Sequence, residues 1–137
     1  MQLRNASPQD TDAIVALWQA CELTRPWNAP EQDIARKLEH GSPFWLVEID
    51  GKLAACVMFD YDGHRASVNY LAVAPTHQGQ GVGRWLMAQV EAHLLAQGCP
   101  KLNLMVRSGN PAEQFYQSLA YQQDPVVVYS KRLISDD

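Results

Sequence analysis

The most constraining feature of this 137-residue sequence is a glycine-rich segment at residues 78–83, QGQGVG. Residues 67–73 precede it, and they are apolar, partly β-branched and stopped by Pro75, which predicts a strand. After it, apolar residues recur at helical spacing from Val82 to Leu94, which predicts the longest helix. Because glycine lets backbone N–H groups approach a ligand closely, this arrangement predicts an anion cradle at a helix N-terminus.

Two other phosphate-binding patterns do not fit this segment. The P-loop of nucleotide triphosphatases requires lysine after its last glycine, whereas Gly83 is followed by Arg84 and Trp85. The dinucleotide fingerprint requires a different glycine spacing and a preceding strand-helix-strand unit, and neither is present here. The sequence therefore disfavours a nucleotide triphosphatase and an enzyme of hydride transfer.

The rest of the chain predicts an α/β or α+β fold with one mixed, mostly antiparallel sheet and helices on both of its faces. Ser7 with Asp10, and Asn28 with Glu31, are expected to cap the first two helices. We expect a single domain over residues 1–137, since two cores would leave each half marginally small. The expected elements are a short N-terminal strand, helices at 7–21 and 28–41, strands at 44–49, 53–59 and 67–73, a helix from Val82 to Gly98, a strand at 101–106, a helix at 111–119 capped by Asn110, and a closing strand at 126–133.

Charge and cysteine usage limit the partners of the chain. A net charge of -4 and a pI of about 5.5 argue against nucleic acid as a partner. No apolar run is long enough to span a bilayer and the N-terminus lacks a signal-peptide pattern, so we expect no membrane association and a cytoplasmic location. Cys21, Cys56 and Cys99 have no metal-ligand spacing, so reduced thiols and no metal site are expected.

Two segments resemble one enzyme superfamily. Gln78, Gly81 and Gly83 match the pattern Q/R-x-x-G-x-G/A, and residues 110–121 match N-x-x-A-x-x-F-Y-x-x-x-G-F/Y. Together they resemble the GNAT superfamily of acetyl-CoA-dependent N-acetyltransferases, closely over residues 67–121. Residues 25–28 and 61–65 further resemble a bacterial subgroup labelled YpeA-like.

The resemblance implies a GNAT fold, with about four helices and a sheet splayed between its fourth and fifth strands. It implies acetyl transfer from acetyl-CoA to a primary amine, of a small molecule or a protein, by direct attack in a ternary complex. The backbone N–H of Leu71 would bind the acetyl oxygen, and Tyr116 would protonate the departing thiolate. The implied acetyl-CoA-binding residues are Leu71, Val73, Gln78, Gly79, Gln80, Gly81, Val82, Gly83, Arg84, Asn110 and Tyr116.

The sequence departs from the family pattern at three places. Ala120 stands where the family has glycine, which is expected to strain a turn, and Gln78 replaces a commoner arginine. Many relatives carry a glutamate at the start of the splayed strand, whereas residues 67–70 here contain no carboxylate. The remaining candidates are Glu48 and His64 for the general base, ahead of Asp60 and Asp62, and Arg25, Trp27, Asn28, Asp60 and Tyr70 for the acceptor site.

Several alternatives stay open at this point. Tyr116 could be an ordinary core aromatic, Asn110 a helix cap, and Arg107 a phosphate ligand or a surface charge. His93 is expected to be half-buried without a role in catalysis. An acyl-CoA-binding sensor without turnover is the second hypothesis, an interaction domain is the third, and a homodimer is compatible with all of them.

Overall fold

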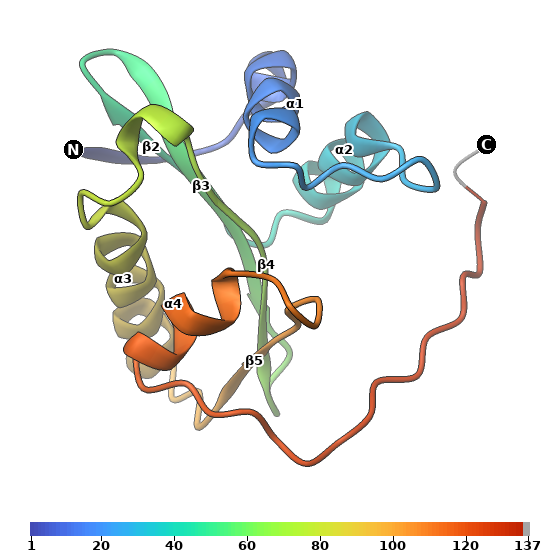
Figure 1. The fold of residues 1–137 in the computed structure, drawn as a ribbon. Helices are drawn as coiled ribbons and strands as arrows, with labels where there is room; N and C mark the ends of the chain where they lie inside the picture. The colour runs from blue at the N-terminus through green and yellow to red at the C-terminus, as the bar shows by residue number, and fades with distance from the viewer. Residues whose placement is uncertain (136–137) are drawn as a thin grey trace.

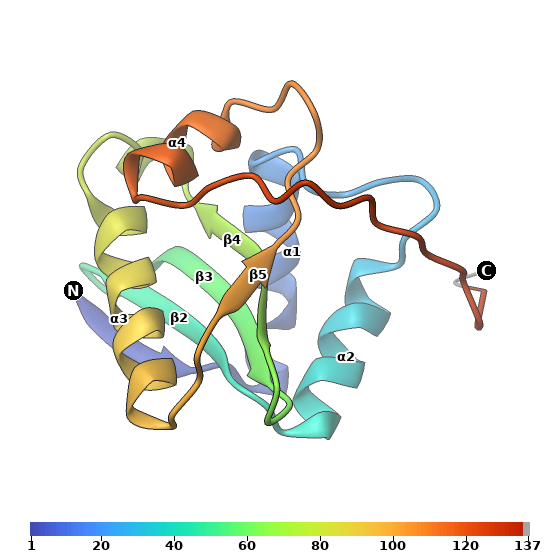
Figure 2. The ribbon, with the colours of Figure 1, turned by 90° about the horizontal axis from the view of Figure 1, so that it is seen from below.

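The structure is a computed structural model that describes residues 1–135. Five strands form one mixed sheet in the order β1-β2-β3-β4-β5 (Figures 1 and 2). Each neighbouring pair among the first four strands is antiparallel, and β4 and β5 are parallel. This confirms the predicted fold class. The strands are β1 (Gln2–Asn5), β2 (Phe44–Ile49), β3 (Lys52–Tyr61), β4 (Ala66–Val73) and β5 (Leu102–Leu104).

Four α-helices cover the two faces of the sheet, α1 (Thr11–Ala20) and α2 (Pro30–His40) on one side and α3 (Val82–Ala96) and α4 (Ala112–Ser118) on the other. Alternate side chains of β3 point to opposite faces. Cys56 therefore packs with α1 and α2, whereas Val57 packs with α3. The result is two separate apolar cores, one on each side of the sheet. No helix among residues 1–135 is long and apolar enough to cross a membrane.

Most predicted turns and caps are found in the structure. Asp10 Oδ2 accepts a hydrogen bond of 2.8 Å from the backbone N–H of Ser7, which confirms the capping box. The predicted cap at Asn28 is wrong, because α2 begins at Pro30 and its N-cap is Ala29. A cap at Asn28 would place Pro30 at the second helical position, where its missing N–H cannot donate.

The parallel pairing of β4 with β5 is short. It joins Ala66 to Leu102 and Val68 to Leu104, although the sequence predicted a strand over 101–106. β4 continues to Val73, five residues beyond Val68, which corresponds to about 17 Å of extended chain. The two strands therefore diverge, and no described strand covers residues 69–73 of β4 on the side of β5.

The predicted closing strand at 126–133 is wrong. Residues 125–135, named the C-terminal arm here, form no strand and stand away from β5 (Figures 1 and 2). A strand needs a hydrogen-bonded neighbour, and the arm leaves the body of the protein after Asp124, whose carboxylate lies 2.9 Å from Lys101 Nζ. The apolar sequence of the arm favours a strand, but it finds no edge within its own chain.

Candidate functional site

A bulge interrupts β4 opposite Val57. Cys56 pairs with Ala72 and Met58 pairs with Asn69, so Tyr70 and Leu71 together oppose a single residue of β3. Tyr70 has a φ of +52°, a conformation that is rare for a bulky side chain. Such backbone strain costs of order 1–3 kcal/mol and often accompanies a functional site. The bulge thus marks this part of β4 for closer inspection.

The backbone directions along β4 follow from two hydrogen bonds. The N–H of Ala66 donates to Lys101 on the side of β5, so Asn69, three residues on, faces β3. The N–H of Ala74 donates to Ala54, so Ala72 also faces β3 and Val73 faces away from it. Asn69 and Ala72 both pair with β3. Tyr70 and Leu71, which lie between them, form the bulge and have no place in the pairing register with β3. The amides of Leu71 and Val73 therefore lie along the edge of β4 that β5 leaves uncovered.

Gln78 fastens the glycine-rich loop to this edge. Its Nε2 donates to the carbonyl oxygen of Val73 over 2.9 Å, and the thiol of Cys21 approaches the same oxygen at 3.2 Å. Gln80 likewise turns inward, donating to the carbonyl of Thr76 at 3.3 Å. Both amide side chains brace the loop by donating to backbone carbonyl groups, although they remain exposed.

The loop ends in a set of backbone donors. Gly79 and Gly81 have φ values of +77° and +82°, and a Cβ at either position would meet nothing within 4 Å. Backbone conformation rather than space therefore requires glycine there. The first helical hydrogen bond of α3 runs from Trp85 to Gly81, so the N–H groups of residues 82–84 lack an acceptor within the helix. They stand at the positive end of a 15-residue helix, which suits a phosphate anion.

Gly83 is the junction of three elements. An added Cβ would lie 3.2 Å from Cζ of Phe115 on α4 and 3.4 Å from Cγ2 of Val73 on β4. A side chain larger than that of glycine would push these neighbours apart by a few tenths of an ångström. The glycine-rich loop and the segment at 110–121 are therefore adjacent in space, as expected for parts of one site.

Tyr116 follows Phe115 on α4 and lies between two aromatic rings. Its ring centroid is 5.0 Å from that of Phe115 and 5.7 Å from that of Tyr121. Burial raises the pKa of Tyr116 to about 12. Because this pKa lies well above 7, the phenol is protonated at neutral pH. Its hydroxyl group forms no hydrogen bond within residues 1–135.

The ends of α4 show how this helix is held. α4 begins at Ala112 with Pro111 as its N-cap, one residue later than the sequence predicted. Asn110 Oδ1 still accepts a hydrogen bond of 2.8 Å from the N–H of Ala112 at the start of the helix. At the other end, Ala120 has a φ of +70°, where glycine would be unstrained. The substitution of alanine for the family's glycine strains this turn, as predicted. Arg84 Nη2 also approaches Ser118 Oγ at 3.4 Å.

Tyr70 connects the bulge to α2, on the face of the sheet opposite to α3 and α4. Its ring stacks on Trp18 with centroids 3.8 Å apart, and its hydroxyl donates to Asp33 Oδ2 over 3.2 Å. Arg36 donates to the other oxygen of Asp33 over 3.0 Å. Sequence analysis missed Asp33, because an acidic residue in the first turn of a helix is common and nothing in the sequence links it to Tyr70.

The loop between α1 and α2 holds three expected acceptor-site residues. The guanidinium of Arg107 lies 5.8 Å above the centroid of the Trp27 ring, which joins this loop to the segment between β5 and α4. Asn28 Oδ1 accepts from Arg132 of the C-terminal arm over 2.9 Å. Arg25 donates to the carbonyls of Glu22 and Thr24, so it holds the turn after α1.

The structure does not bring the expected base candidates to Tyr116. Glu48 lies opposite Leu53, with β3 between it and β4, and accepts from Arg4 over 2.6 Å. His64 is in the exposed turn before Ala66. β4 runs five residues from Ala66 to Leu71, which corresponds to about 17 Å of extended chain. Asp60 pairs with Ser67 at that same distant end.

The other titratable candidates also have structural contacts. Asp62 Oδ1 accepts from the backbone N–H groups of Arg65 and His64, which lowers the pKa of Asp62. His93 is half-buried against the rings of Trp45 and Phe59, as predicted. Within residues 1–135 there is no cluster of three or more histidine, cysteine, aspartate or glutamate side chains that could hold a metal ion.

Comparison with known proteins agrees with this arrangement. The family described as "Acetyltransferase (GNAT) family" matches residues 12–121. An acetyltransferase of Sodalis glossinidius is 44% identical over 139 residues, covering 99% of this chain and 98% of its own. A solved structure from Agrobacterium tumefaciens superposes with a TM-score of 0.78 at 19% identity, covering 96% of this chain and 100% of that chain. A Clostridium acetobutylicum protein, solved with acetyl-CoA and described as a predicted acetyltransferase, has a TM-score of 0.73 at 14% identity and 95% coverage of both chains.

Proposed function

The chain belongs to the GNAT family of acetyltransferases, which use acetyl-CoA, and from this premise we propose transfer of an acetyl group to a primary amine by direct attack in a ternary complex. The observation that carries the proposal is the open edge of β4. Backbone donors from the bulge and from the start of α3 lie along it, and the contact of Gly83 with Phe115 holds α4 against it. The conformations of Gly79 and Gly81 shape the loop between these donors.

Donors on this edge suit two parts of a coenzyme A molecule. The N–H groups of Val82, Gly83 and Arg84 would hold the diphosphate, with the charge of the Arg84 side chain beside them. The outward amides of Leu71 and Val73 would pair with the pantetheine amides, in the manner of an added strand. Gln78 contributes by holding the loop in place, since its own amide is bonded to Val73.

Two groups of the chain would act on the reacting atoms. Bound acetyl-CoA supplies an acetyl thioester. The N–H of Leu71 stabilises the negative charge that grows on the acetyl oxygen, more strongly in the transition state than in the ground state. As the amine nitrogen forms its bond to the acetyl carbon and the C–S bond breaks, Tyr116 would give its proton to the sulfur, and the proton lost from nitrogen would return to the phenolate through solvent. This role is consistent with a hydroxyl that is protonated and forms no hydrogen bond within residues 1–135.

The acceptor amine would approach from the side of Tyr70. Its hydroxyl and the Asp33 carboxylate form a polar site next to the bulge, bordered by the loop that holds Arg25, Trp27 and Asn28. The carboxylate would accept a hydrogen bond from the acceptor amine and orient it, and only the neutral amine carries the lone pair that attacks the acetyl carbon. At pH 7, removing a proton costs about 4.6 kcal/mol for a lysine side chain but only about 1 kcal/mol for an α-amine. A weakly basic primary amine is therefore the proposed acceptor.

The test compares two glycines that share a conformation but not a location. Gly81 in the loop and Gly63 in the turn between β3 and β4 both have positive φ, and a Cβ added at either would meet nothing within 4 Å. Alanine at either position costs about 1–2 kcal/mol of backbone strain. We expect Gly81→Ala to raise the KM for acetyl-CoA about tenfold, and Gly63→Ala to leave it unchanged.

Turnover is measured as release of free thiol from acetyl-CoA, with a panel of α-amines and lysine-like amines as acceptors. Product analysis by mass spectrometry verifies that the amine is acetylated. Release that requires an α-amine supports the whole proposal. Equal effects of the two substitutions on the KM for acetyl-CoA would contradict the assignment of the loop, and no acetylated amine across the panel would contradict the proposed reaction.

A further inference from the structure

The C-terminal arm exposes an unusual amount of apolar surface. The chain has an accessible surface of 9028 Å², whereas a compact protein of 15.3 kDa exposes about 7,100 Å². The excess is about 1,900 Å². Much of it belongs to six large apolar side chains of the arm that are between 62% and 93% exposed: Val126, Val127, Val128, Tyr129, Leu133 and Ile134.

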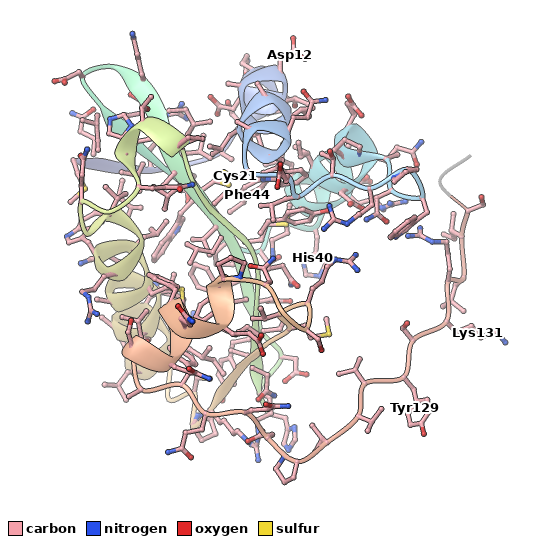
Figure 3. All side chains as sticks on the ribbon, viewed as in Figure 1. Asp12, Cys21, His40, Phe44, Tyr129 and Lys131 are labelled. Carbon is pink, nitrogen blue, oxygen red and sulfur yellow. The ribbon has the colours of Figure 1, made fainter. Side chains whose placement is uncertain are left out.

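The arm has the composition of a strand but pairs with no strand among the residues that the structure describes. Residues 126–129 are β-branched or aromatic, which favours extended, paired backbone. The arm is tied to the body near its start by the ion pair of Asp124 with Lys101 and near its end by Arg132 with Asn28. Figure 3 shows Tyr129 and Lys131 between these two points, on a part of the arm that stands away from the sheet.

The sheet of the same chain has an open edge. β5 is the last strand in the order, so among residues 1–135 it pairs only with β4. The segment after it continues with Met105, whose side chain is 70% exposed. An unprotected strand edge presents free N–H and C=O groups and readily accepts a strand from another chain.

We propose that two copies of this chain exchange arms, each arm pairing with the β5 edge of the other copy. The two complementary elements lie on one chain, so a twofold axis satisfies both contacts at once and closes the assembly. The excess surface of about 1,900 Å² per chain exceeds the roughly 800 Å² that each partner buries in a standard interface. The inference does not depend on the proposed reaction.

The first experiment measures mass in solution by light scattering and sedimentation over a range of concentrations. We expect twice 15.3 kDa for the unmodified protein. Val127→Pro removes a ladder donor and an apolar side chain from the middle of the arm. Each dimer carries the change twice, so the dissociation constant should rise by about two to four orders of magnitude.

The matched control is Ala16, which is exposed on α1, on the other side of the sheet from α3 and α4. Ala16→Lys and Val127→Lys each replace an exposed apolar side chain and add the same charge. Only Val127→Lys should weaken the dimer. Circular dichroism and thermal unfolding verify that both variants are folded. A monomer at every concentration, or a dimer that tolerates both substitutions at Val127, would overturn the proposal.

Hydrogen exchange locates the pairing. Backbone amides of residues 126–129 should be protected in the dimer and should exchange freely after dilution to the monomer. Protection that is independent of concentration would mean that the arm pairs within its own chain, which would also overturn the proposal. An equimolar mixture of differently tagged copies should form a mixed dimer at the rate at which the dimers dissociate.

Discussion

Replacing Tyr116 with phenylalanine separates a catalytic hydroxyl from a structural aromatic ring. The ring remains between Phe115 and Tyr121, so the packing of α4 is retained. Only the hydroxyl is lost, and it has no hydrogen-bond partner within residues 1–135. The free energy of unfolding at pH 7 should therefore stay within about 1 kcal/mol of its original value. A general acid of this kind contributes 10²–10⁴-fold, so kcat should fall by about that factor.

The pH dependence of stability gives a second, independent magnitude. The pKa of Tyr116 is raised to about 12 in the folded protein and is about 10 in the unfolded chain. Below pH 10 both states are protonated, and the stabilising contribution of the neutral phenol is fully present. As the pH rises from 10 to 12, only the unfolded state loses the proton, and up to about 2.7 kcal/mol of stability is lost. Tyr116→Phe should abolish that part of the alkaline loss.

Tyr121→Phe is the matched control. The hydroxyl of Tyr121 donates to Glu91 Oε2 over 2.6 Å, so its removal should cost about 1 kcal/mol of stability at pH 7 without lowering kcat. Activity is followed by thiol release with saturating acetyl-CoA, and stability by urea unfolding at pH 7 and pH 11. If Tyr116→Phe keeps kcat within threefold, or if both variants lose activity equally, the assignment of Tyr116 as proton donor is refuted.

Two further predictions test the turn after α4 and the acceptor side. Ala120→Gly relieves the strain of a φ of +70° and should stabilise the protein by about 1 kcal/mol, or about 3 °C in the Tm measured by calorimetry; a lower Tm would contradict this reasoning. Asp33→Asn removes the carboxylate beside Tyr70 and should raise the KM for the acceptor about tenfold, with the KM for acetyl-CoA unchanged. The control Glu48→Gln should alter neither value. Both are measured in the same steady-state assay, and an unchanged acceptor KM in Asp33→Asn would exclude this residue from the acceptor site.

The sheet and the glycine-rich loop before α3 could be predicted from the sequence because their signals are local. Glycines with positive φ and the helical spacing after Val82 each act within a few residues. That the glycine-rich loop and the segment at 110–121 lie together was implied only by the resemblance, and the contact of Gly83 with Phe115 was not predicted, since no local pattern reveals which distant ring meets a glycine.

The acceptor side and the chain terminus depend on contacts between distant residues. The hydrogen bond of Tyr70 with Asp33 joins residues 37 positions apart, and it requires a bulge that the sequence of β4 does not predict. For the same reason, the sequence did not predict that Gln78 bonds to Val73 or that Asn28 bonds to Arg132. The strand predicted at 126–133 has the right composition, but strand formation also requires an edge to pair with, and composition says nothing of that.

The division of the interior into two cores has a consequence for how such enzymes diversify. One layer, built around α3, carries the proposed phosphate-binding loop, and the other, built around α1 and α2, lies beside the proposed acceptor site. The sheet insulates each layer from the other, because side chains from alternate positions of β3 serve different layers. On the proposed assignment, substitutions in α1 and α2 could change the acceptor side while the packing of α3 and of the glycine-rich loop stays as it is.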